Sequence, residues 1–140
     1  MTAATDLLGF ARGALERYVD VTADADGSLS FVHAGVPCAV QSVELAEGLV
    51  VLSTTCVLAW DLEPGPRVSD LVGRLGAQVQ FGGLGLVEVI DDDGGITSDV
   101  TLRYAFPAVG LEPEPLATLL LLVVSGASRA RTELREALGL

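Results

Sequence analysis

Two acidic stretches of the sequence contain the residue types that bind divalent cations. "TADADGSLSFVH", from Thr22 to His33, places Asp24 and Asp26 ahead of Gly27, as in the loop of a calcium-binding EF-hand. That motif begins with an aspartate and has a bidentate glutamate at its twelfth position, where this sequence has Thr22 and His33. The segment that follows also has the pattern of a strand, where the motif needs a helix. We therefore predict a turn in which aspartate side chains accept hydrogen bonds from backbone N–H groups and Gly27 adopts a positive φ, and no metal site.

The second acidic stretch is "DDDGG" at residues 91–95. Three adjacent carboxylates point in different directions from a turn, so we predict a solvated hairpin tip. His33 is the only histidine, and a general base needs a nucleophile or a partner carboxylate beside it in a cleft. The sequence marks neither, and alternation places His33 on one strand face with Leu29 and Phe31. An enzyme that uses His33 remains an alternative that requires such a cleft.

Known catalytic and cofactor-binding motifs are not found in the sequence. It contains no GxSxG, no GxxxxGK and no cluster of cysteines and histidines. "FGGLGL" at residues 81–86 lacks the last glycine of a dinucleotide-binding fingerprint, and a strand follows it instead of a helix. We therefore predict a protein that is not an enzyme, with no catalytic residue, no cofactor and no bound metal.

Composition and charge restrict the classes of partner. The chain has 140 residues, the size of one domain, and half of them are apolar. This excess of apolar surface favours a homodimer or a protein partner. The net charge is −11 and every basic residue is an arginine, so the surface repels phosphate backbones and anionic lipids. We expect neither nucleic acid nor a membrane as a partner.

The chain ends and the cysteines indicate a cytoplasmic protein. The first ten residues, "MTAATDLLGF", contain no basic segment and no long apolar segment of a signal peptide. The apolar run from Leu116 to Val124 is about half the roughly 20 residues that a membrane-spanning helix needs. Cys38 and Cys56 lie in apolar surroundings, and in a reducing compartment we expect both to be buried free thiols, with a disulfide between them as the alternative.

Periodicity predicts an α+β domain with three helices and a five-stranded, mostly antiparallel sheet, in the order α-β-β-β-α-β-β-α. Thr5 is the expected cap of the first helix. The strand at residues 49–62 is apolar on both faces, so it belongs in the middle of a sheet that is covered on both sides or faces a partner. The expected helices span residues 5–19, 63–80 and 112–139, and the expected strands residues 28–35, 36–45, 49–62, 84–90 and 97–106.

This element order, with the length and the acidic, apolar-rich composition, resembles the type III secretion chaperones and the YbjN-like proteins. The resemblance covers the whole chain and is carried by "LLGFARGALERYV", "LVVLSTTCVLAW", "VSDLVGRLGAQV" and the terminal helix from Leu116. It implies a homodimer whose helices pack on one face of a twisted sheet and which holds extended segments of a partner protein. It also implies no enzymatic activity and no cofactor.

The sequence thus favours a dimeric, non-enzymatic module that binds a protein or peptide through apolar side chains. The alternative is a small-ligand-binding domain with an apolar cavity between sheet and helices. Trp60, the only tryptophan, is either a core residue or a contact anchor. The predicted partner-binding residues are Val51, Val57, Trp60, Leu71, Leu75, Leu119, Leu120 and Val123.

Overall fold

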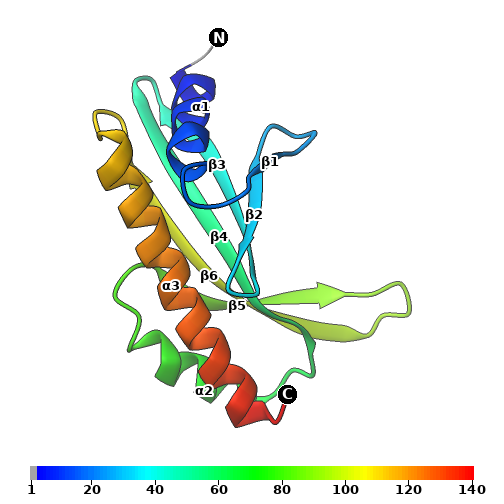
Figure 1. Ribbon diagram of the computed structural model, residues 1–140. Helices are drawn as coiled ribbons and strands as arrows, with labels where there is room; N and C mark the ends of the chain where they lie inside the picture. The colour runs from blue at the N-terminus through cyan, green and yellow to red at the C-terminus, as the bar shows by residue number, and fades with distance from the viewer. Residues whose placement is uncertain (1–2) are drawn as a thin grey trace.

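The computed structural model describes residues 3–140 as one antiparallel sheet with a layer of helices on one of its faces (Figure 1). The strand order is β1-β2-β3-β4-β6-β5, and every neighbouring pair is antiparallel. The helices are α1 (Ala3–Leu15), α2 (Pro66–Gly76) and α3 (Pro113–Leu138), and the strands are β1 (Thr22–Ala23), β2 (Leu29–His33), β3 (Val36–Ala46), β4 (Leu49–Leu62), β5 (Gly83–Ile90) and β6 (Ile96–Pro107). The predicted α+β class with three helices is confirmed.

The sheet has six strands, so the prediction of five was wrong. The additional strand is β1, which has two residues and pairs through Thr22 with Ser30 and through Ala23 with Leu29. A segment this short has no alternation to detect, and its backbone becomes a strand only because β2 folds back beside it. The sequence therefore placed these residues in the turn that follows.

The predicted turn at Asp24 to Gly27 is confirmed. Gly27 has a φ of 90°, which its lack of a side chain permits. The backbone N–H of Ser28 donates to Asp26 Oδ1 at 3.0 Å, and the Ser28 hydroxyl lies 2.6 Å from the same oxygen. These hydrogen bonds hold the pKa of Asp26 below its ordinary value. The Asp24 carboxylate accepts from the Ser30 hydroxyl at 3.1 Å, so both aspartates are used within the loop.

The core lies between the sheet and the helices. On β4, alternate residues such as Leu52 and Cys56 face the helices and have no exposed surface. Helix α2 contributes Val68, Leu71, Val72 and Leu75 to the same cluster of buried side chains. All three helices bury side chains in this one cluster, and therefore they cover a single face of the sheet.

Helix α3 has the predicted extent, because local signals at both ends define it. Pro113 is in its first turn, where its missing N–H costs nothing, and Gly139 ends it with a left-handed φ of 71°. Its first half contains the apolar run from Leu116 to Val124. Leu120 and Val123 are fully buried, but Leu122 is 47% exposed, so this helix also has a solvent-facing side.

Helix α1 starts earlier than the sequence indicated. Thr5 was predicted as its cap, but the helix already includes Ala3, so Thr5 lies inside it. The carbonyl of Ala4 accepts a hydrogen bond from the hydroxyl of Ser42 on β3, which ties the first turn of the helix to the sheet. A tertiary contact of this kind leaves no signal in the local sequence.

One buried hydroxyl makes no hydrogen bond. Thr54 on β4 has no exposed surface, and among the described residues its Oγ1 has no partner. A buried polar group without a partner costs about 1–3 kcal/mol. Thr54→Val keeps the shape and removes that group, so we expect the free energy of unfolding to rise by about 1 kcal/mol, measured by urea denaturation. Thr54→Ser, which keeps the hydroxyl and loses a methyl group, is the control and is expected to be less stable than the native protein.

Candidate protein-binding surfaces

The face of the sheet opposite the helices is not covered by any described residue that forms a second layer (Figure 1). We refer to it as the open face. Apart from Gln41 and Arg103, its centre consists of small or β-branched side chains that are paired across β3, β4 and β6. The strand register assigns these residues to the open face: Thr22, Ser30, Val32, Pro37, Ala39, Gln41, Val43, Val51, Ser53, Thr55, Val57, Gly83, Gly85, Val87, Val89, Thr97, Asp99, Thr101, Arg103, Ala105 and Pro107.

Charge is nearly absent from the open face. Among the strand residues that the register assigns to it, only Asp99 and Arg103 are ionised, one of each sign. The whole chain has a net charge of −11, and its other acidic residues lie on the helices, in the loops, at Asp61 near the end of β4, or, like Glu44 and Glu88, on strands at positions that the register assigns to the helical side. A neutral surface of small side chains is inexpensive to desolvate, which suits contact with another protein.

The predicted partner-binding residues do not form one surface. Four of them, the side chains Leu71, Leu75, Leu120 and Val123, are at most 5% exposed and pack inside the core. Leu119 is partly buried against that core. The pattern of apolar residues identified them correctly as buried, but the surface that buries them belongs to the same chain.

The other three predicted residues come from β4 and lie away from the core cluster. Val51 and Val57 are on the open face, where Val51 is buried and Val57 is half-buried between neighbouring strands. Trp60 is 58% exposed, which excludes the core alternative for the only tryptophan. These three residues remain predicted contact residues, and their positions at the open face and the end of β4 are compatible with that role.

A bulge positions Trp60 at the surface. On β4, Trp60 and Asp61 occupy the interval opposite the single residue Asp99 of β6. Asp61 has a φ of 56°, a left-handed conformation that is unfavourable for a residue with a side chain. The carboxylate of Asp99 accepts a hydrogen bond from the Asp61 N–H at 2.9 Å and so stabilises this conformation. The bulge changes the direction of the last residues of β4 and leaves the tryptophan exposed.

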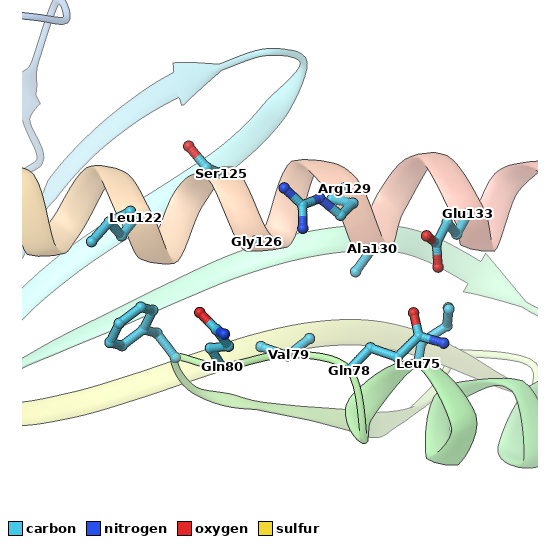
Figure 2. A pocket seen from close by; sticks show the side chains of 11 residues that line it. Leu75, Gln78, Val79, Gln80, Leu122, Ser125, Gly126, Arg129, Ala130 and Glu133 are labelled. Carbon is cyan, nitrogen blue, oxygen red and sulfur yellow. The ribbon is translucent and has the colours of Figure 1, made fainter.

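A groove runs between α3 and the segment that joins α2 to β5 (Figure 2). Its volume is about 220 Å³, smaller than the roughly 300–1,000 Å³ of typical small-molecule sites. Leu122, Ala130 and Glu133 point into it from α3, and Leu75 and Val79 approach from the other side. The groove is partly open to solvent and is lined by both polar and apolar side chains, so it is not the closed apolar cavity that the small-ligand alternative requires.

The outer half of the β5–β6 hairpin is the exposed apolar feature that the sequence analysis missed. It projects beyond the helices, so neither face of it is covered there (Figure 1). At its tip, Asp91 Oδ1 accepts hydrogen bonds from the N–H groups of Asp93 and Gly95, which confirms the predicted turn. The exposed apolar residues of the hairpin are Leu86, Val87, Val89, Ile90 and Ile96. The signal was present in "LGLVEVI", which contains no proline and no lysine to protect an edge strand.

The two cysteines lie opposite each other in the core, and the histidine lies at the end of β2. Cys38 and Cys56 are free, buried and directly opposite each other on β3 and β4. The thiol of Cys38 donates to the carbonyl oxygen of Val36 at 3.4 Å, and its interaction with the neighbouring Cys56 thiol raises the pKa of Cys38 and lowers that of Cys56. His33 is half-buried at the end of β2, and none of the described residues forms a hydrogen bond or ion pair with its side chain.

Within residues 3–140, no group of three or more histidine, cysteine or acidic side chains is arranged to hold a metal ion. None of the helices in that part of the chain is long and apolar enough to cross a membrane.

Comparisons with known proteins give one informative similarity. No family model matches the sequence, and no curated protein matches it significantly. Among solved structures, the chain is similar to YbjN from E. coli, described as a proposed transcription regulator, with a TM-score of 0.62 and 16% sequence identity. The similarity covers 95% of this chain and 93% of the YbjN chain. The chain therefore has a YbjN-like fold, whereas the resemblance to type III secretion chaperones stays a prediction.

Proposed function

We propose that the protein is a non-enzymatic, cytoplasmic module that acts as a homodimer and binds a protein partner through the open face of its sheet. The observation that carries this proposal is the neutrality of that face: Asp99 and Arg103 are its only ionised strand residues, in a chain of net charge −11. An uncovered sheet face of small apolar and hydroxyl side chains loses little on desolvation and gains about 25 cal/mol for each Å² of apolar surface that the partner buries, before the costs of association.

Charge distribution also indicates which partners fit. The acidic residues outside the open face repel acidic proteins and nucleic acids and attract basic segments, so neutral or basic partners are favoured. YbjN is described as a proposed transcription regulator. If the present protein has a regulatory role, its charge favours one exerted through protein contacts, because a net charge of −11 opposes binding to DNA.

Site-specific photo-crosslinking in the native cell tests this function. A benzophenone amino acid at Val43, which is 38% exposed on the open face, is expected to form discrete adducts with a protein. The matched control is the same amino acid at Leu122, which is 47% exposed on the helical side. Ser53→Arg introduces a charge at the centre of the open face. It is expected to lower the yield of adducts from Val43 at least tenfold.

Three results would contradict the proposal. Equal adducts from Val43 and Leu122, adducts that persist in Ser53→Arg, or cross-links to nucleic acid would exclude the open face as a specific protein-binding surface. Circular dichroism of Ser53→Arg establishes that the variant is folded, which the half-buried position of Ser53 on a solvent-facing sheet leads us to expect.

A further inference from the structure

The two edges of the sheet differ in their ability to pair with another strand. One edge ends in β1, which has two residues and is followed directly by the acidic turn at Asp24 and Asp26. The other edge is β5, with eight residues, Gly83–Ile90, and a single charged side chain, Glu88. Its pairing with β6 contains no bulge, and it contains no proline or lysine. Long, regular, apolar edges of this kind are templates for pairing with another chain.

Side chains on both faces of β5 are exposed where the hairpin extends past the helices. Leu86 is 36% exposed on the helical side, and Val87 and Val89 are 39% and 40% exposed on the open face. Ile90, at the end of the strand, is 72% exposed. A strand added beside β5 would shelter both rows of side chains and would also satisfy the free backbone groups of the edge.

Symmetry restricts how β5 can pair with a second copy of itself. Two antiparallel β5 strands in one continuous sheet are related by a two-fold axis normal to the sheet, and directly opposite residues point to the same face. Residues that lie opposite each other must therefore be an even number of positions apart in the sequence. As a result, one residue at the centre of the pairing lies opposite its own copy, and the axis passes between the two. If that residue were Glu88, two carboxylates would oppose each other, which is unfavourable. Pairing centred on Leu86 or on Val87, the two residues at the middle of the strand, avoids this repulsion. In both cases Glu88 lies opposite an apolar residue.

Pairing at this edge produces a closed dimer and not an open-ended fibre of chains. Each chain has one edge that is able to pair and one that is nearly closed. Pairing β5 with β5 occupies the one edge of each copy that is able to pair. Only the two short β1 edges then remain free, so assembly stops at two chains. We infer that the β5 edge is the homodimer interface, formed by two-fold antiparallel pairing centred on Leu86 or Val87. This inference rests on the dimer in the proposed function and specifies its surface.

Disulfide cross-linking of single cysteine variants tests the interface. Directly opposite Cα atoms in an antiparallel pair are about 4.5–5.5 Å apart, within the range of a disulfide. Leu86→Cys or Val87→Cys is therefore expected to give a covalent dimer with diamide, seen on a non-reducing gel. Ile90→Cys is the register control, because its two copies would be about 20 Å apart or more. Val32→Cys, 66% exposed near the other edge, is the edge control, and the native protein controls for its buried thiols.

Light scattering completes the test. The native protein is expected to have the mass of a dimer at micromolar concentration, and the double variant Leu86→Lys, Val87→Lys that of a monomer with unchanged circular dichroism. A native dimer that survives both lysines, with no cross-link at Leu86 or Val87, overturns the β5 interface and leaves the proposed function intact. A native monomer overturns both the interface and the dimeric part of the proposed function. Equal cross-linking of Ile90→Cys or Val32→Cys also overturns the interface.

Discussion

Gly82→Ala is expected to lower the free energy of unfolding by about 3 kcal/mol, because two unfavourable effects coincide at this position. Gly82 has a φ of 97°, which residues with a side chain rarely adopt. An ideal Cβ at this residue would lie 2.8 Å from the carbonyl oxygen of Arg103 and 2.9 Å from Leu102 Cδ2. Gly82 therefore allows the chain to pass close to β6 just before β5 begins. Urea denaturation followed by circular dichroism measures the loss.

The neighbouring glycine provides the matched control. Gly83 has no positive φ, and an ideal Cβ there meets no atom within 4 Å. Gly83→Ala is therefore expected to change stability by no more than about 0.5 kcal/mol. Similar losses in the two variants would contradict the close approach of Gly82 to β6 and would indicate a general sensitivity of this segment.

Leu120→Ala is expected to lower the free energy of unfolding by about 3 kcal/mol, the usual cost of a cavity at a fully buried leucine. Leu120 has no exposed surface and packs in the core beneath α3. Leu120 was predicted from the sequence to bind a partner, and a core role and a contact role give different results on mutation. A core residue affects unfolding of the isolated chain, whereas a contact residue affects association and leaves the isolated chain nearly unchanged.

Leu122 is the control on the same helix. It is 47% exposed, so Leu122→Ala is expected to cost about 0.5 kcal/mol or less in thermal or urea unfolding. If Leu122→Ala were as destabilising as Leu120→Ala, the orientation of α3 on the sheet would have to differ from that described here.

Local patterns were sufficient for most of the secondary structure. Helix α3 could be predicted because prolines at its start and Gly139 at its end set its limits independently of the rest of the chain. The β5–β6 hairpin followed from alternation on each side of an acidic, glycine-containing turn. Strand β1 could not be predicted, because two residues have no periodicity and their conformation depends on pairing with β2.

The candidate surfaces were less predictable than the elements. Apolar periodicity identifies side chains that leave water, but it does not distinguish burial inside the chain from burial against a partner. Four of the predicted contact residues are buried inside the chain itself: Leu71, Leu75, Leu120 and Val123. In contrast, β4 was expected to be covered on both sides or to face a partner, and the structure leaves its Val51 side without a helical layer.

The sequence by itself determined that this chain is an acidic α+β domain with three helices, a hairpin tip at residues 91–95 and a loop at Asp24 to Gly27 that is a turn. Each of these follows from neighbouring residues, whose periodicity and turn chemistry act over a few positions. Only the tertiary structure decided that all helices cover one face, that the other face is nearly neutral and that β5 is the unprotected edge. These properties depend on which distant segments lie side by side, and packing between elements, not local preference, sets that arrangement.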